Sequence, residues 1–445
     1  MQFRSTRSLG LKSAGLRSAD TVTVSFKDAI LNCLPANGGL YVPDSVVDMR
    51  QYILYMDSAT SYPELVATVA PALLQGELNP FSAARVAESA FDFEPQLKQL
   101  DDTLSVLTLC NGPTGVFKDY GIAFLAAVME ELLGSTRRAM ILSAARGDTG
   151  VSIAHAFSRR RGMVSVIIYP SGPVRGLDPA TYVTNGGNVI PIQITGAFDD
   201  CQRLIVEAIN DRPFAERYGI TSGNAINPGR LLPQVFYYFY AFIKLKKILT
   251  GELVFSVPSG NFGNLIAGLY AWKMGMPVNG FIAAMNANNA FGDYVKGKEF
   301  KPGKLIQTNS PAMDVSVPSN YERLASFYAE APAVMRHMVY PDAIDDATTL
   351  AAMEAAWKSY GILLDPHSAV AFAAARRLSR TAGFNGHVVV LATGHPAKYA
   401  ELVAQTTGRQ VPIPAAFTNL WKRTDPMATI SPELDALEGA IASCL

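Results

Sequence analysis

The chain has 445 residues, with 38 basic and 38 acidic side chains, and only 17% of its residues are charged. This balance argues against a highly charged polymer or surface as a partner. We therefore expect the protein to bind neither nucleic acid nor an anionic membrane. No apolar run reaches the roughly 18 residues of a membrane helix, and the scattered cysteines indicate neither a disulfide framework nor a metal site; they are Cys33, Cys110, Cys201 and Cys444. We therefore expect a cytoplasmic protein of two or three domains.

The first part of the chain differs in pattern from the rest. Residues 1–98 carry scattered helical patterns and the turn-rich sequence NGGLYVPD, which indicates a separate N-terminal domain. From residue 139 onward, apolar β-branched runs alternate with helical patterns, as in a parallel α/β sheet covered on both faces. We expect strands at 139–145, 165–171, 188–194, 253–259, 279–285 and 387–393, helices at 121–133, 151–160, 230–249 and 265–274, and a long loop at 286–320.

The first chemically informative segment is NGPTGVFKDYGIAFLAAVME, at 111–130. Its turn-forming start delivers Lys118 to the entrance of an apolar helix. A lysine that reacts with a carbonyl group needs such a partly desolvated place, because burial disfavours the ammonium and leaves more free amine. Taken alone, the motif also fits an ordinary surface lysine.

Two glycine-containing loops each follow a predicted strand and open a predicted helix. In RGDTGVSIAHAF, at 146–157, Asp148 and Thr149 lie at the turn, and in VPSGNFGNLIAG, at 257–268, glycines alternate with hydrogen-bond donors. Backbone N–H groups at such helix starts bind anions, and glycine allows a close approach. The second loop lacks the lysine of a nucleotide-binding loop and the spacing of a dinucleotide site, so a compact phosphomonoester is the better ligand. Plain strand-to-helix turns remain the alternative.

The other candidate segments precede helices. In NAINPGRLLPQ, at 224–234, the planar guanidinium of Arg230 could bind a phosphate, or it could be a solvated surface group. His367 in DPHSAVAF and His395 in LATGHPAKY have no metal ligands at suitable spacing, so we expect them to cap or pack helix starts. Thr393, at a predicted strand end, is suited to contact a bound ring.

Taken in order, these motifs resemble threonine synthase, a fold type II pyridoxal-phosphate enzyme with a tryptophan synthase β-like α/β fold. The resemblance extends over nearly the whole chain and includes STRS, FKDAILNCLPANGGLYVPD and SPAMDVSVPSNYERL, which separate threonine synthases from other members of the fold. It implies a threonine-synthase-type domain at 1–98, a large cofactor-binding domain at 99–119 and 226–445, and a smaller catalytic α/β domain at 120–225.

The resemblance also implies a reaction and a set of site residues. The reaction is the conversion of O-phospho-L-homoserine and water to L-threonine and phosphate, by a monomer or homodimer, with pyridoxal 5'-phosphate carried by Lys118 as the catalytic residue. The implied cofactor-binding residues are Lys118, Asp148, Ser259, Gly260, Asn261, Phe262, Gly263, Asn264 and Thr393, and the implied substrate-binding residues are Arg146, Thr149, Asn224 and Arg230.

The sequence departs from the family around the expected substrate-phosphate pocket. Ala145 and Arg146 replace a Thr-Ser pair, Ala225 replaces a serine, and a Gln-rich segment is replaced by one that contains Arg175 and Asp178. Arg146 could substitute for the lost hydroxyl donors. The alternatives are an enzyme that acts on another phosphorylated or acidic amino acid, and a non-catalytic homologue that binds the cofactor.

Overall fold

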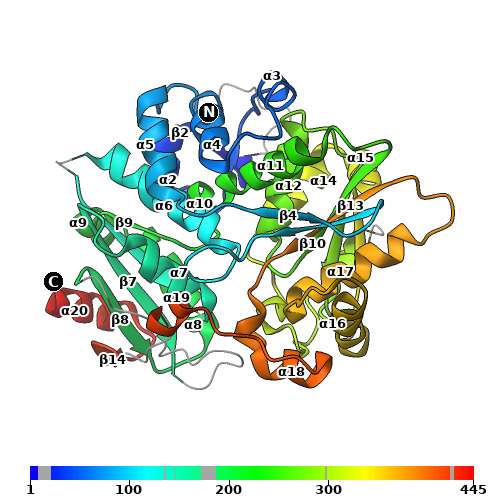
Figure 1. Ribbon diagram of the computed structural model, residues 1–445. Coiled ribbons are helices and arrows are strands. Elements are labelled where there is room, and N and C mark those ends of the chain that lie inside the picture. Colours follow the sequence, from blue (N-terminus) through cyan, green and yellow to red (C-terminus); the bar gives the residue numbers. More distant parts are fainter. Residues whose placement is uncertain (9–21, 135–136, 146, 172–186, 296–297, 421–424) are drawn as a thin grey trace.

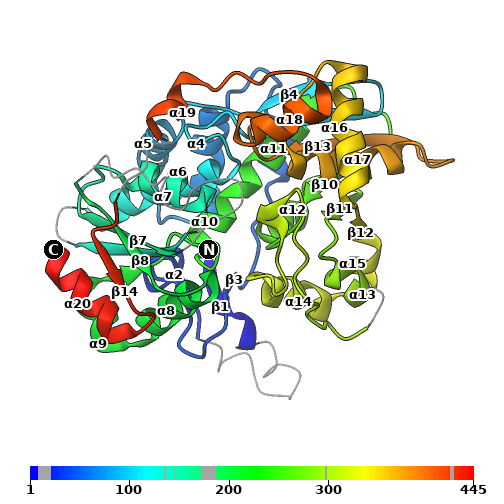
Figure 2. The same cartoon turned by 90° about the horizontal axis from the view of Figure 1, so that it is seen from below.

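The computed structural model describes residues 1–8, 22–134, 137–145, 147–171, 187–295, 298–420 and 425–445. Their strands form three sheets. Figures 1 and 2 show the two larger sheets on opposite sides of the molecule, with helix α10 (Pro228–Leu231) between them. Within the described part of the chain, every helix is too short or too polar to span a bilayer.

The N-terminal region forms a small antiparallel sheet and several helices. The sheet has the order β2 (Val24–Ser25), β1 (Gln2–Ser5), β3 (Tyr41–Pro43), and the helices are η1 (Thr6–Ser8), α2 (Phe26–Asn32), α3 (Arg50–Ile53), α4 (Tyr62–Leu73) and α5 (Pro80–Ala90). Arg4 forms an ion pair with Glu330 at 3.1 Å, and Thr6 donates to Glu322 at 2.5 Å. Both glutamates belong to α14 (Tyr321–Glu330), so side-chain contacts join this region to a helix more than 300 residues further along the chain.

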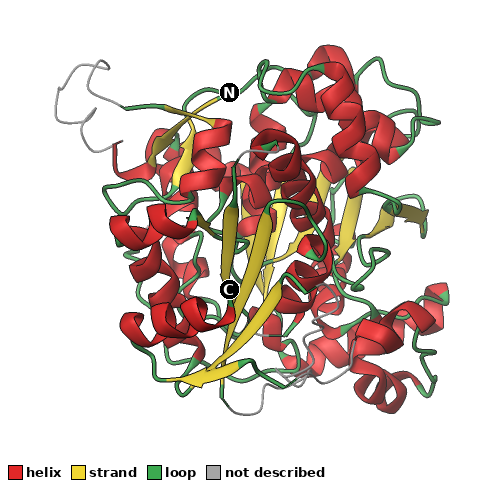
Figure 3. Cartoon of the chain, turned by 90° about the vertical axis from the view of Figure 1, so that its left-hand side faces the viewer, coloured by secondary structure: helices red, strands yellow, loops and turns green. Residues whose placement is uncertain are grey.

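The five-stranded sheet is parallel throughout. Its order is β14 (Ala428–Ile430), β8 (Val189–Ile194), β7 (Met163–Pro170), β6 (Ala139–Ala144), β9 (Ile220–Thr221), and its helices are α7 (Asp148–Phe157), α8 (Phe198–Asn210), α9 (Arg212–Tyr218) and α20 (Leu434–Cys444). Ile141 packs in the apolar cluster that contains α6 (Lys118–Leu133), whereas Met140 and Leu142 pack in the cluster that contains α8 and α20. Figure 3 shows helices on both sides of this sheet. The prediction of a parallel sheet covered on both faces is confirmed.

The six-stranded sheet carries the other half of the core. Its order is β12 (Val339–Ala343), β11 (Gly280–Met285), β10 (Glu252–Pro258), β13 (Gly386–Ala392), β5 (Leu104–Thr108), β4 (Gln96–Gln99), all parallel except β4. Its helices are α12 (Gly263–Lys273), α13 (Ala290–Val295), η4 (Pro311–Met313), α15 (Pro332–Met338), α16 (Asp346–Tyr360), α17 (Pro366–Ser379), η5 (Pro396–Tyr399), α18 (Ala400–Thr407) and α19 (Ala415–Leu420). Val389 and Leu391 face the cluster shared with α6, and Val388 and Val390 face the opposite cluster. Both faces of this sheet are therefore buried.

The helix expected at 230–249 is interrupted in the structure. It consists of α10, a short 3-10 turn η3 (Leu232–Gln234) and α11 (Val235–Leu245). Pro233 explains the interruption, because proline has no N–H to donate and its ring crowds the preceding turn. The six predicted strands are all present, within two residues of their expected ends. The proposed division into three domains remains a prediction; β14 pairs with β8, so the end of the chain returns to the five-stranded sheet.

Candidate active site

The turn before α6 is joined to the end of strand β13. Phe117 donates its backbone N–H to the carbonyl oxygen of Thr393 at 2.9 Å, and His395 donates to the carbonyl oxygen of Gly115 at 2.9 Å. Lys118, the first residue of α6, therefore lies at the carboxyl edge of the six-stranded sheet. This is the edge at which open α/β sheets bind their ligands.

Asp119 holds the loop that precedes Lys118. Its carboxylate accepts hydrogen bonds from the backbone N–H of Thr114 at 2.9 Å, from the hydroxyl of Thr114 at 2.5 Å, and from the hydroxyl of Ser152. A Cβ atom on Gly112 would lie 2.6 Å from this carboxylate, which explains the glycine of the NGPTG turn. Burial raises the pKa of Asp119, although these hydrogen bonds offset part of the effect. Asp119 is thus a structural anchor for the lysine turn.

Lys118 is paired with a carboxylate that a second lysine also binds. Lys118 Nζ lies 3.9 Å from Asp148 Oδ2, and Lys398 Nζ lies 2.6 Å from Asp148 Oδ1. Only 17% of the Lys118 side chain and 1% of the Lys398 side chain are exposed. Asp148 is the first residue of α7 and Lys398 lies in η5, so the pair connects the two large sheets.

Burial and charge set the protonation of this pair. Burial would raise the pKa of Asp148, but the charges of Lys398 and Lys118 outweigh it and lower that pKa to about 2. Burial lowers the pKa of Lys118, with Asp148 opposing the change and the cations of Arg230 and Lys398 adding to it. A buried amine with a lowered pKa next to a stable carboxylate is suited to covalent and proton-transfer chemistry.

The loop at 259–264 connects β10 to the start of α12. Phe262 adopts a left-handed backbone conformation, with φ of 59°, and its ring packs 4.7 Å from that of Phe291. Strain of this kind in a bulky residue concentrates at ligand sites. Asn264 accepts hydrogen bonds from Tyr237 at 2.6 Å and Tyr238 at 2.8 Å through its side-chain oxygen, while its side-chain nitrogen is buried with no partner among the described residues. The loop thus retains an unused donor beside a helix N-terminus.

The other residues of this loop have different surroundings. A Cβ atom on Gly260 would lie 2.9 Å from Met313 Cα, whereas one on Gly263 would meet only Asn320 Nδ2, at 3.5 Å, and Ala225 Cβ, at 4.0 Å. A methyl group would therefore fit at Gly263 but not at Gly260. Two further residues predicted for the site contact protein groups: Ser259 donates through its hydroxyl to Val257 O at 2.8 Å, and Asn261 accepts from Ser319 N at 3.0 Å.

Arg230 is a buried cation. It is 5% exposed, donates through Nη1 to Gly223 O at 2.9 Å, and forms no ion pair within the described residues. Its Nε is buried without a partner, and burial lowers the pKa of Arg230 to about 10. The Asn224 side chain, in contrast, is bonded to the backbone of Ala144. Its amide oxygen accepts from Ala144 N at 2.9 Å, and its amide nitrogen donates to Ala144 O at 2.7 Å. Arg230 therefore remains available to an anion, and Asn224 positions the end of β6.

A buried carboxylate supports Thr393. Asp365 caps α17 and accepts from the Ser368 hydroxyl and backbone, and that hydroxyl accepts from Thr393 N at 2.9 Å. The His367 ring bridges two groups. Its Nδ1 lies 2.6 Å from the Asp365 carboxylate, and its Nε2 accepts a hydrogen bond from Ala312 N at 3.0 Å. The expected packing role of His367 is confirmed, as is capping by His395, which accepts from the N–H of residue 397 at 3.1 Å.

The positions singled out around the expected substrate phosphate fall partly within the described residues. Arg146, Arg175 and Asp178 lie outside the described residues. Thr149 is half-buried in the first turn of α7.

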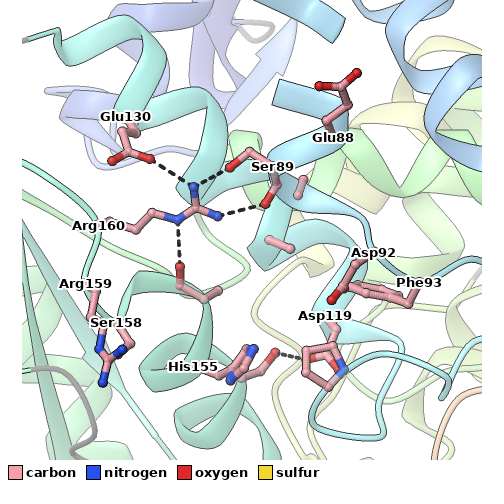
Figure 4. Close-up of a pocket in the computed structure, with 15 residues that line it drawn as sticks. Glu88, Ser89, Asp92, Phe93, Asp119, Glu130, His155, Ser158, Arg159 and Arg160 are labelled. Carbon is pink, nitrogen blue, oxygen red and sulfur yellow. Dashed lines mark hydrogen bonds and ion pairs between the residues drawn. The ribbon is translucent and has the colours of Figure 1, made fainter. Parts of the chain in front are cut away.

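A separate cavity of about 470 Å³ lies between α5, α6 and α7 (Figure 4). Asp119, Ser152 and His155 are among its lining residues, whereas Lys118 is not. Arg160 is already bound there, by Glu130 at 2.9 Å and by the Ser89 hydroxyl at 2.6 Å. The cavity therefore does not coincide with the predicted site.

Comparisons with known proteins assign the chain to a class. A family model described as pyridoxal-phosphate dependent enzyme matches residues 96–394, threonine synthase N terminus matches residues 15–91, and threonine synthase, C-terminal, matches residues 368–441. The fold, with a lysine at the entrance of α6, defines a fold type II pyridoxal-phosphate-dependent enzyme. A threonine synthase of Serratia marcescens is 34% identical over 398 residues, which is 88% of this chain and 90% of the relative.

Solved structures agree with the sequence relatives. The pyridoxal-phosphate-bound threonine synthase of Brucella melitensis has a TM-score of 0.87 and 30% identity, covering 100% of this chain and 99% of that one. The threonine synthase of Escherichia coli has a TM-score of 0.86 and 30% identity, with 100% of both chains covered. The chain belongs to the threonine synthase family.

Lys398 and Asp119 were not among the sequence-predicted site residues. Both occur in segments singled out from the sequence: Asp119 in NGPTGVFKDYGIAFLAAVME and Lys398 in LATGHPAKY. The signal for Asp119 was its position next to Lys118 at a helix start. No local signal identified Lys398, because its partner is 250 residues away along the chain.

Proposed function

We propose that this chain converts O-phospho-L-homoserine and water to L-threonine and phosphate, using pyridoxal phosphate carried by Lys118. The observation that carries the proposal is Arg230, a buried guanidinium without an ion pair in the described structure, close enough to Lys118 to lower the pKa of its amine. An unpaired buried cation is costly unless an anion binds it. A phosphorylated amino acid brings an anion and an amino group to such a site.

The residues present fit the cofactor. A low-pKa lysine amine can form the covalent link, and the N-terminus of α12, with the unused Asn264 amide and a glycine at its first position, can receive a phosphate group. Thr393, at the end of β13, is proposed to contact the ring. When bound, pyridoxal phosphate delocalises the electron pair left by removal of a substrate α proton.

The chain's own groups then have distinct tasks. Lys118 Nζ removes the α proton and later returns a proton, which a lowered pKa facilitates. Asp148 remains ionised and orients Lys118, and Lys398 holds Asp148 in place. Arg230 binds the substrate phosphate, with Arg146 and Thr149 proposed as further donors. Asn224 supports this pocket through its two bonds to Ala144.

We also propose that the protein acts in the cytoplasm as a monomer or homodimer. All four cysteines are free thiols, and three of them are buried, which supports a reducing compartment. Cell fractionation tests the compartment, and light scattering of the purified chain tests the assembly.

The decisive experiment is turnover with three substrates. The purified protein, loaded with pyridoxal phosphate, is incubated with phosphohomoserine, phosphoserine or phosphothreonine, and released phosphate and amino acids are quantified. We expect threonine and phosphate in equal amounts from phosphohomoserine alone. Phosphate release from another substrate only, or no release at all, would contradict the proposal.

A further inference from the structure

Asn320 is a buried residue whose amide is not used for the task its position suggests. It is the N-cap of α14, where an asparagine side chain ordinarily accepts a hydrogen bond from the first turn of the helix. Here the side chain makes no capping bond. The residue is fully buried, and its Nδ2 has no partner among the described residues. The amide group is therefore directed elsewhere, with a donor unsatisfied.

Arg323 determines the orientation of the Asn320 side-chain amide. Its Nη1 donates to Asn320 Oδ1 at 2.6 Å, and its Nε donates to Tyr41 O at 3.0 Å. The same guanidinium donates to Ala225 O at 2.8 Å and to Ile226 O at 2.5 Å. A guanidinium has only donors, so the atom of Asn320 that it contacts must be the oxygen. The NH₂ group consequently lies on the opposite side of the amide.

That NH₂ group lies near the start of α12. Asn320 Nδ2 lies 3.5 Å from the place a Gly263 Cβ would take, and Ala225 Cβ lies 4.0 Å from that place. Gly263 is the first residue of this 11-residue helix, whose N-terminal N–H groups attract anions. The Asn264 Nδ2, also buried and unpartnered, belongs to the next residue. Two residues with unsatisfied amide donors thus lie at one helix start.

The surrounding charge favours an anion. Arg323 and Arg230 are both buried, and neither forms an ion pair within the described residues. Arg323 is instead bonded to three carbonyl oxygens and one amide oxygen, all neutral. A tetrahedral anion with several acceptor oxygens satisfies donors arriving from different directions. A phosphate monoester has this chemistry.

We propose that Asn320 is a further ligand-binding residue that donates a hydrogen bond through Nδ2 to a phosphate monoester at the start of α12. The proposal deepens the proposed function and rests on it. Ala225, whose Cβ lies 4.0 Å from the Gly263 Cβ position, has no side-chain donor. The phosphate is that of the cofactor or that of the substrate, and Arg323 is the positioning residue that orients the amide.

Asn320→Asp removes the Nδ2 donor and keeps an oxygen atom for the bond from Arg323. The substitution replaces the NH₂ group by oxygen and leaves an oxygen that Arg323 can still bond. Two measurements separate the sources of phosphate: retention of pyridoxal phosphate by the loaded enzyme during dialysis, followed by absorbance, and affinity of the loaded enzyme for inorganic phosphate, measured by calorimetry. We expect either an at least tenfold faster loss of cofactor or an at least tenfold weaker binding of phosphate.

Asn385→Asp is the matched control. Asn385 is exposed and precedes β13, at the end of the strand opposite Thr393, so the same change in charge should alter neither measurement. Asn320→Ala is the second variant, because Arg323 retains three backbone acceptors when the amide is lost. It should show a smaller loss than Asn320→Asp, which adds repulsion.

Each result has one meaning. Faster loss of cofactor assigns Asn320 to the cofactor phosphate, and weaker phosphate binding alone assigns it to the substrate phosphate. Unchanged values in both measurements for both variants would overturn the proposal. The proposed function fails on a different observation, the absence of threonine formation by the unmodified enzyme, and neither binding measurement depends on turnover.

Discussion

The backbone N–H of Phe117 lies 2.9 Å from the carbonyl oxygen of Thr393, to which it donates a hydrogen bond. This bond joins the residue before Lys118 to the residue after β13. The amine proposed to carry the cofactor and the residue proposed to contact its ring are therefore joined through one backbone hydrogen bond. Such positioning on regular elements is what a catalytic site requires.

Replacing Lys118 by alanine should abolish covalent attachment of pyridoxal phosphate and reduce threonine formation to background, because Lys118 is the amine at this position. The measurement is borohydride reduction of the loaded enzyme followed by peptide mapping. Lys358→Ala, at an exposed lysine of α16, is the control and should keep the label on Lys118. A label on Lys398, the second lysine bonded to Asp148, would show that the roles of the two lysines are reversed.

Two glycines of the 259–264 loop should respond differently to the same substitution. Gly260→Ala places a Cβ atom 2.9 Å from Met313 Cα, so the backbone must shift, and we expect a loss of about 1–3 kcal/mol in unfolding free energy. Gly263→Ala meets neighbours only at 3.5 Å or more, so stability should be kept while pyridoxal phosphate binds at least about tenfold more weakly. Calorimetric Tm values without ligand and a cofactor titration check both. Equal cofactor affinity for Gly263→Ala and the unmodified chain would contradict the placement of the phosphate.

The sequence predicted the two sheets well because their strands are short β-branched runs with both faces buried. The division of Val388 to Leu391 between two apolar clusters is the physical basis of that continuous pattern. The position of Lys118 at a helix start could be predicted for a similar reason, since the turn before it is a local pattern. Local patterns thus predict the elements and the place of Lys118 among them.

Contacts between distant segments could not be predicted in this way. Lys398 has the sequence context of a surface lysine, yet it is buried against a carboxylate 250 residues away. Asn320 occupies a position at which asparagine normally caps a helix, and only the bond from Arg323 reveals that its amide is directed elsewhere. The close approach of the Met313 backbone, 2.9 Å from the place a Gly260 Cβ would take, is another contact that the sequence pattern does not reveal.

Arg230→Gln should raise the KM for phosphohomoserine about 10- to 150-fold while pyridoxal phosphate remains bound. Glutamine keeps a planar donor but removes the charge that the substrate phosphate would pair with. Steady-state kinetics and the cofactor absorbance provide the two readouts. Arg217→Gln, at an arginine whose side chain is 64% exposed, is the matched control and should behave like the unmodified enzyme. An unchanged kcat/KM for Arg230→Gln would remove Arg230 from the substrate site.

Lys398→Met should destabilise the protein in a pH-dependent manner. Lys398 and Lys118 lower the pKa of Asp148 from 3.8 to about 2, which corresponds to about 2 kcal/mol of unfolding free energy. Because the folded-state pKa is depressed, this contribution is fully present above about pH 4 and is lost as the pH falls toward 2. The difference in Tm between the unmodified chain and Lys398→Met should therefore be largest near neutral pH and shrink below pH 4.

Lys358→Met is a stringent control for this last prediction, because Lys358 and Glu354 are also 2.6 Å apart. Their side chains are 68% and 47% exposed, compared with 1% for Lys398 and 14% for Asp148. An exposed pair of this kind contributes only about 0.5 kcal/mol, since water screens it. Equal effects of the two substitutions would mean that burial adds nothing to the Lys398–Asp148 pair. A large difference that does not change with pH would mean that Lys398 stabilises the fold by packing alone, because only a bond to an ionised carboxylate weakens as that carboxylate is protonated.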